Sequence, residues 1–358
     1  MPLPPYLFVS RILNMNVTYG EFKEGSSIEA EYDVPFDSIM AVSKKMLASV
    51  VYSEAGHIGI FLAACMGIDE YSHGKTKFRI TDVTTKYVSD LWPQPGDTVR
   101  MTFVIDKFIQ NGDTTLLICT YRVYLHDELI IDAKETGGFF TQEVLDNGAG
   151  VVTGNLFASL PENNLETNLY RPVTNKKAFA KEEVHMFFKG EHRKCMGKNV
   201  VNSDMPYQVC DDAIFVDEIL DMSSNGGKYG LGYIVASKEI EPSFWPFQCH
   251  FKNDPVLPGT IMLEGLSQVL TFFETCMGIF NTQNKFETRV RTGYPVQTKF
   301  RGEVKCAKHT LLYKVYPKEV KMVDGKVRFI ADGEVYCDGL QVITQKNIGM
   351  MVVECSET

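Results

Sequence analysis

Residues 258–278 read PGTIMLEGLSQVLTFFETCMG, and this stretch decides the fold. Pro258 at its start and Gly278 at its end are typical of helix termini, so the pattern predicts one long helix between them. A helix that is apolar on almost every side must be buried all round. Strand-like segments with short turns surround it. The sequence therefore predicts an α+β fold in which an antiparallel sheet wraps around one long central helix.

The same pattern occurs twice along the chain. Five pairs of similar segments keep the same order and almost the same separation along the sequence. They include FVSRILNM (8–15) with FVDEILDM (215–222), CMG (65–67) with CMG (276–278), and VYLHDELIIDAK (123–134) with VYCDGLQVITQK (335–346). Such colinearity indicates a tandem duplication. We expect one copy at 1–150, a linker with a packed helix at 151–208, and a second copy at 209–358.

The composition of the chain argues against several classes of protein. The 358 residues carry 36 Lys and Arg against 45 Asp and Glu, a formal charge of −9, which argues against nucleic acid as a partner. Apolar runs are too short to cross a bilayer, and the N-terminus lacks the positive region of a signal peptide. Nine cysteines without a CxxC pair are typical of reduced thiols and give no zinc pattern. We expect a cytoplasmic protein with no membrane span and no metal.

The second copy contains the segment WPFQCHFKNDPVLPGTIMLEGLSQ at 245–268. His250 lies among aromatic residues and can act as a base near neutral pH. A DPVLPG turn then leads to the first amides of the helix, at Gly259 and Thr260, where an oxygen that gains negative charge would be stabilised. Glu264 and Gln268 are four residues apart on one face of that helix, and a carboxyl in apolar surroundings favours its protonated form. A base, amide donors and an acid thus lie close together in one short segment.

This segment resembles the active-site motif of the hotdog-fold β-hydroxyacyl thioester dehydratases. The HF-x-x-DPV-x-PG core is similar to that of the β-hydroxydecanoyl-acyl-carrier-protein dehydratases, and the doubled arrangement resembles the tandem dehydratase regions of polyunsaturated fatty acid and polyketide synthases. The resemblance implies a double hotdog that removes water from a β-hydroxyacyl chain on acyl carrier protein to give a trans-2-enoyl thioester. It implies that His250 is the base, that a carboxyl is the acid, and that Gly259 binds the thioester carbonyl. Phosphopantetheine would carry the substrate, and no cofactor is implied.

The identity of the acid stays open at this point. In single-copy relatives the site lies between two protomers, so the resemblance implies that His250 faces the helix of the first copy, which carries Glu54 and His57. With the two CMG segments aligned, Gln268 matches His57, but Glu264 matches Ser53, and Glu54 then lies about 100° further around the helix. Pairing within one chain favours Glu54. A homodimer that pairs two second copies favours Glu264.

The first copy lacks a histidine and a DPVLPG turn in its stretch PFDSIMAVSKKML (35–47), so we expect one site per chain. Three alternatives remain: an enoyl isomerase, a thioesterase, and a non-catalytic acyl-binding module. The segment 176–198 carries seven Lys and Arg against three Glu, and we expect either a solvated face or a docking surface for an acidic acyl carrier protein.

Overall fold

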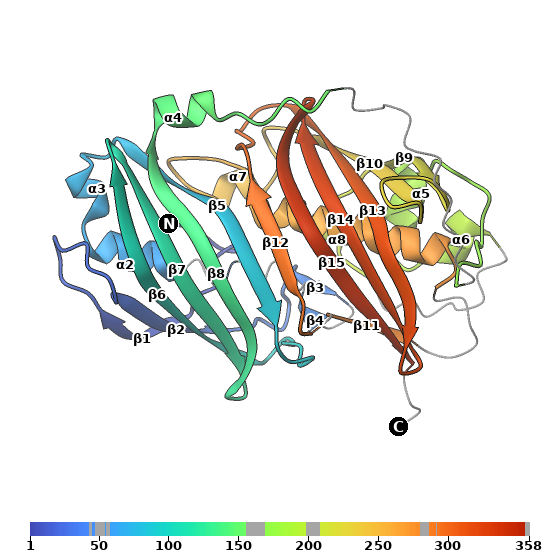
Figure 1. Cartoon of the computed structure of the whole chain (residues 1–358), viewed down its shortest axis with the longest axis horizontal. Coiled ribbons are helices and arrows are strands. Elements are labelled where there is room, and N and C mark those ends of the chain that lie inside the picture. Colours follow the sequence, from blue (N-terminus) through green and yellow to red (C-terminus); the bar gives the residue numbers. More distant parts are fainter. Residues whose placement is uncertain are drawn as a thin grey trace. The chain divides into compact units, whose positions relative to one another are not determined.

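The predicted central helix is α8, Gly259–Cys276, in the computed structural model of the chain (Figure 1). The structure describes residues 1–42, 45–46, 54, 58–154, 169–197, 208–279, 286–290 and 292–354. Leu266, Val269, Leu270, Phe272 and Phe273 of α8 are all fully buried, as a helix that is apolar on every side requires. The chain forms two structural units, each described in turn.

Unit 1 comprises residues 1–151, 242–260 and 292–307. Its antiparallel sheet has the strand order β1-β2-β6-β7-β8-β5-β12. The elements are β1 (Arg11–Asn16), β2 (Ser27–Asp33), β3 (Ala41–Val42), β4 (Lys45–Met46), α2 (Gly59–Cys65), α3 (Ile68–Tyr71), β5 (Thr76–Tyr87), β6 (Thr98–Asn111), β7 (Thr114–Leu125), β8 (Glu128–Thr141), α4 (Gln142–Asn147), α7 (Pro246–Cys249) and β12 (Pro295–Phe300). Helix α2 packs on β6, where Gly59 lies so close to the Phe103 ring that a Cβ would clash.

Unit 2 comprises residues 152–241, 261–291 and 308–358. Its antiparallel sheet has the order β9-β10-β13-β14-β15, with β11 paired to β15. The elements are α5 (Lys181–Phe188), α6 (His192–Met196), a 3₁₀ turn (Asp211–Ala213), β9 (Glu218–Ser223), β10 (Tyr233–Ile240), β11 (Phe286–Val290), β13 (His309–Val323), β14 (Lys326–Cys337) and β15 (Leu340–Glu354). Helix α8 packs on this sheet, with Gly265 against Tyr313 and Leu266 against Gly333.

The tandem duplication is confirmed by the irregularities of the two sheets. A bulge between Ile105 and Lys107 in the β6–β7 pair recurs between Pro317 and Glu319 in the β13–β14 pair. The irregularity after Val123 in the β7–β8 pair recurs after Val335 in the β14–β15 pair, at the same separation along the chain. The strand order β1-β2-β6-β7-β8 repeats as β9-β10-β13-β14-β15. Each copy is therefore an antiparallel sheet packed on a helix, and the predicted double hotdog is confirmed.

The boundaries of the units differ from those of the sequence copies. Segments 242–260 and 292–307 belong to the second copy but lie in unit 1. Strand β12 pairs with β5, Val296 opposite Thr85 and Thr298 opposite Val83, and this backbone pairing holds the second segment in unit 1. The second copy thus contributes its histidine motif to the unit formed by the first copy.

The connecting segment contains the predicted packed helix as α5. Val184, Phe187 and Phe188 of α5 are fully buried, whereas Phe179 precedes the helix and bridges Ile219 instead. Four of the basic side chains here form ion pairs, Lys176 with Glu183, Lys181 with Asp217, Lys189 with Asp211 and Lys194 with Glu191. These pairs offset part of the local positive charge on which docking of an acidic partner would depend.

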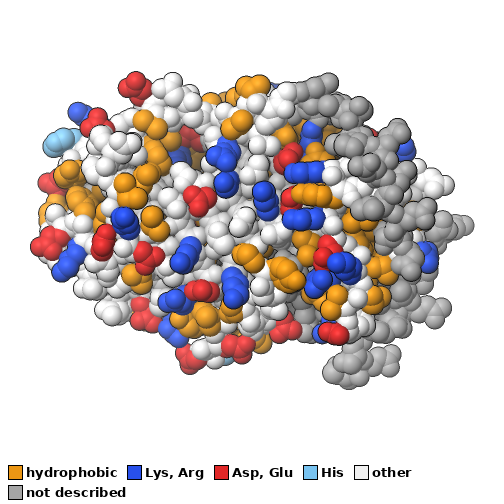
Figure 2. Space-filling view, viewed as in Figure 1, with side chains coloured by type: hydrophobic (Ala, Val, Ile, Leu, Met, Phe, Trp, Pro, Cys, Tyr) orange, Lys and Arg blue, Asp and Glu red, His pale blue; other side chains and the backbone are white. Residues whose placement is uncertain are grey.

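The surface of the protein carries charges of both signs. On the face drawn in Figure 2, basic and acidic side chains lie interspersed among uncharged and apolar ones. Within the described ranges, none of the helices combines the length and the apolar character that crossing a membrane would require.

Candidate active site

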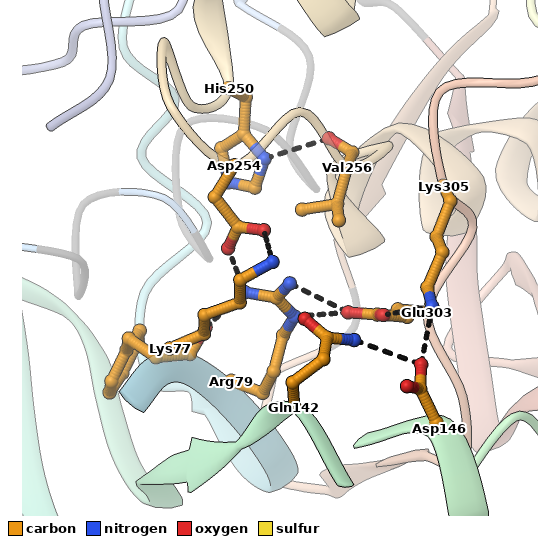
Figure 3. Close-up of polar contacts among 10 residues, drawn as sticks. Lys77, Arg79, Gln142, Asp146, His250, Asp254, Val256, Glu303 and Lys305 are labelled. Carbon is orange, nitrogen blue, oxygen red and sulfur yellow. Dashed lines mark hydrogen bonds and ion pairs between the residues drawn. The ribbon is translucent and has the colours of Figure 1, made fainter. Parts of the chain in front are cut away.

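His250 directly follows α7 and begins the turn that leads into α8. Its side chain is 8% exposed, and its Nδ1 lies 3.1 Å from the backbone oxygen of Val256 (Figure 3). A carbonyl oxygen can only accept a hydrogen bond, so Nδ1 must carry the hydrogen. The neutral ring then keeps its lone pair on Nε2. In this tautomer Nε2 is the ring nitrogen that is able to accept a proton.

The turn that places Val256 is closed by its own backbone. The amide of Phe251 donates to the oxygen of Asp254 and the amide of Asp254 donates back, both at 3.1 Å. The amide of Val256 donates to the oxygen of His250 at 3.0 Å. Since Val256 both donates to His250 and accepts from its ring, the turn and the imidazole orientation form one hydrogen-bonded unit.

Glu54 lies in the same structural unit and is 5% exposed. Its Oε1 accepts two hydrogen bonds, from the Tyr6 hydroxyl at 2.7 Å and from the Thr260 hydroxyl at 2.6 Å. The two hydroxyls also contact each other. Because Oε1 is taken by two donors, a proton on this carboxyl belongs on Oε2. The predicted residues Glu54 and Thr260 are therefore brought together.

Sequence reasoning missed Tyr6. Its ring packs edge-on against the His250 ring, with centroids 5.5 Å apart and an interplanar angle of 84°. Its hydroxyl reaches Glu54, so Tyr6 touches both groups. Burial, and then the nearby charge of Glu54, raise the pKa of Tyr6 well above its ordinary value, which keeps the phenol a hydrogen-bond donor. The amide of Leu3 donates to the oxygen of Cys249 at 2.9 Å and so ties the N-terminal segment to α7.

The amino end of α8 completes this part of the site. Gly259 begins the helix, and the first amides of a helix have no acceptor within it. A Cβ at position 259 would lie 2.4 Å from the Phe300 ring, so only glycine fits this approach. The helix is 18 residues long, and its dipole favours negative charge at this end. Gly259 and Thr260 are thus placed as predicted, at the start of the helix that follows the His250 turn.

Glu264 and Gln268 lie in unit 2. The Gln268 side-chain oxygen accepts the amide of Phe215 at 2.9 Å, and its nitrogen donates to the oxygen of Ala213 at 2.7 Å. The Gln268 side chain therefore binds the backbone of Phe215 and Ala213 rather than presenting its amide to a substrate. Glu264 is 2% exposed, and burial together with the charges of Asp217 and Glu264 raises the pKa of Tyr313. His57 lies outside the described residues.

Comparison with known proteins agrees with the motif. Residues 212–346 match the family model of the FabA-like domain. One of the subunits of the polyunsaturated fatty acid synthase from Thraustochytrium sp. is 25% identical over 328 residues. That match covers 89% of this chain but only 22% of the relative, so the chain spans about a fifth of its length. The resemblance of the second copy to the dehydratases is confirmed by the FabA-like match.

Two solved structures match nearly the whole chain at low sequence identity. The CurJ dehydratase is 10% identical with a TM-score of 0.45, covering 97% of this chain and 96% of its own. The 12:0-ACP thioesterase from Umbellularia californica is 10% identical with a TM-score of 0.44, covering 92% of this chain and 98% of its own.

Proposed function

We propose that the chain is a β-hydroxyacyl thioester dehydratase of fatty acid or polyketide synthesis, with His250 as its base and Glu54 as its acid. The observation that carries the proposal is that one structural unit holds both groups. The Val256 oxygen accepts from Nδ1 of His250, and the Tyr6 side chain contacts both the His250 ring and the Glu54 carboxyl. The FabA-like match over the segment that contains His250 supports the same chemistry.

In the proposed reaction, Nε2 of His250 takes the proton from the α-carbon of the acyl chain. The electron pair of that C–H bond forms the α,β double bond as the bond from the β-carbon to its hydroxyl oxygen breaks. The departing hydroxyl takes the proton of Glu54 Oε2 and leaves as water. His250 ends protonated and Glu54 ends ionised, so one proton returned from His250 to Glu54 restores the starting state.

The amino end of α8 is proposed to hold the thioester carbonyl. Removal of the α-proton shifts negative charge onto that oxygen, and the Gly259 amide can stabilise it as the charge develops. Thr260 follows directly and donates to Glu54, so the hydroxyl that binds the acid and the amide donor lie in one helical turn. The two protons are moved by side chains alone, and we propose that the reaction uses no cofactor.

Glu54 rather than Glu264 is proposed as the acid. Glu54 is tied by two hydroxyls to the residues around His250, and it reaches them within a single chain. This choice implies one site per chain and no requirement for a second chain. The finer proposals are that acyl carrier protein delivers the substrate on a phosphopantetheine arm and that the reaction takes place in the cytoplasm.

A mass-spectrometric assay tests the proposal. The purified chain is incubated with a β-hydroxyacyl thioester, and the acyl group is expected to lose the mass of one water. His250→Ala should lower the rate by about 10²–10⁴-fold. His126→Ala is the matched control, because the His126 side chain is 69% exposed and its loss should leave the rate unchanged. Free acid as the product would indicate a thioesterase, a moved double bond an isomerase, and binding without turnover an acyl-binding module.

A further inference from the structure

A pair of basic residues on β5 lies against the turn that follows His250. Lys77 and Arg79 are two residues apart and so point to the same face of the strand. The Nη1 of Arg79 donates to Oδ2 of Asp254 at 2.6 Å, and Nζ of Lys77 lies 2.8 Å from Oδ1 of the same carboxylate (Figure 3). Both oxygens of Asp254 are therefore held by cations supplied by the first copy.

Arg79 also reaches a second carboxylate. Its Nε donates to Oε2 of Glu303 at 2.8 Å. The segment after β12 that carries Glu303 runs antiparallel to the turn, since the amide of Leu257 donates to the oxygen of Val304 at 2.8 Å and Val256 bridges Lys305. Arg79 thus joins the turn that contains Val256 to the segment paired with it, and the Val256 oxygen accepts from the His250 ring.

The contacts of Arg79 are more than a surface ion pair. The side chains of Arg79, Asp254 and Glu303 are 14%, 19% and 8% exposed. Exposed pairs contribute about 0–1 kcal/mol, but the loss of one cation costs more where the carboxylates are partly buried and poorly solvated. Burial alone would raise the pKa of Asp254, but its hydrogen bonds from Arg79 and Lys77 lower it, so this carboxylate stays ionised. Arg79 therefore binds one carboxylate from each of the two segments.

We propose that Arg79 is a positioning residue that fixes the orientation and tautomer of His250 through Asp254, Glu303 and the Val256 carbonyl. The chain of contacts runs from the guanidinium to the turn, from the turn to Val256, and from Val256 to Nδ1 of His250. The first copy, whose stretch 35–47 has no histidine, would thereby take part in the chemistry of the second. The kinetic part of this inference rests on the proposed dehydratase function.

Substitution of Arg79 tests the kinetic part. Arg79→Gln should lower kcat by about 10-fold to 10²-fold, the loss expected when a catalytic group is displaced by a fraction of an ångström to about 1 Å. KM should stay within about twofold, because a positioning residue acts through His250 rather than on the substrate. Arg79→Lys keeps the charge but cannot bind two carboxylates in a fixed fork, so it should restore only part of kcat.

A spectroscopic readout separates positioning from the proposed function. With ¹⁵N-labelled histidine, the signals of His250 are assigned by their loss in His250→Gln. In the wild type at neutral pH, Nδ1 should carry the hydrogen, and in Arg79→Gln the two tautomers should mix. This measurement needs no substrate. If the tautomers mix while the wild type turns over no thioester, the proposed function fails and the positioning role of Arg79 stands.

Two further variants keep the test decisive. Arg100→Gln is the matched control, because Arg100 lies in the same unit and pairs with Glu29 at 3.0 Å, and it should change neither kcat nor the tautomer. Asp254→Asn keeps the shape of the side chain but removes its negative charge, and with it the ionic contact to Arg79. This variant takes the place of Arg79→Gln if Arg79→Gln does not fold. An unchanged His250 tautomer in a folded variant of either kind would overturn the proposal.

Discussion

Replacement of Glu54 by glutamine isolates the proton that the mechanism requires. In the wild type, Oε1 of Glu54 accepts from Tyr6 at 2.7 Å and from Thr260 at 2.6 Å. The glutamine side chain keeps an oxygen at that position for both hydroxyls but has no acidic proton. Loss of a general acid lowers a rate by about 10²–10⁴-fold. At about 1.4 kcal/mol for each factor of ten, this is an increase of about 3–5 kcal/mol in the activation barrier.

The assay for Glu54→Gln is single-turnover dehydration of a β-hydroxyacyl thioester, followed by mass spectrometry. Glu264→Gln is the matched variant, because it makes the same chemical change at another buried carboxyl. We expect Glu264→Gln to keep its rate within a few-fold and both variants to unfold at temperatures close to the wild type. A rate that collapses in Glu264→Gln and persists in Glu54→Gln would refute the assignment of the acid.

Three further predictions concern other buried polar groups. Tyr6→Phe keeps the ring against His250 but removes the donor to Glu54, so kcat should fall about 10-fold, as for one hydrogen bond of about 1 kcal/mol or slightly more. The unfolding midpoint should fall by no more than a few degrees. Asp217 is 3% exposed and lies beside Lys238 and His185. Burial alone would raise the pKa of Asp217, but these two partners lower it below the ordinary aspartate value. The ionised carboxylate therefore stabilises the fold above the ordinary aspartate pKa, and this stabilisation is lost as pH falls. Denaturant unfolding should therefore show Asp217→Asn less stable by about 3 kcal/mol at pH 7, a difference that shrinks in acid. Burial raises the pKa of Glu274 to about 8, and neither oxygen has a hydrogen-bond partner among the described residues, so its ionisation destabilises the fold increasingly from about pH 4.5 upward. Glu274→Gln should match the wild type at pH 5 and exceed its free energy of unfolding by up to about 4 kcal/mol at pH 8, and equal stability at both pH values would contradict this.

The features that follow from local pattern could be predicted from the sequence. The apolar character of α8 on every side requires burial, and the helix ends at the expected residues. The duplication is visible in the nearly constant separation of the paired segments, because both copies keep the same strands and the same bulges. The turn between His250 and Gly259 is set by its prolines and glycine, which act locally.

The features that depend on contacts distant in the chain could not be predicted. Tyr6 meets Thr260 across 254 positions and Arg79 meets Asp254 across 175, and neither contact leaves a periodic signal in the sequence. The place of segment 292–307 in the unit of the first copy follows from the β5–β12 pairing, which no local pattern determines. For the same reason, alignment of the two copies could not choose between Glu54 and Glu264.

The central claim is that His250 and Glu54 act together within one chain. A complementation measurement tests it: His250→Ala and Glu54→Gln chains are mixed one to one after joint refolding, and dehydration is compared with each variant alone and with the wild type. The account predicts an active wild type and a mixture no faster than its two components. Recovery of about a quarter or more of the wild-type rate by the mixture would show that base and acid come from different chains and would contradict the account.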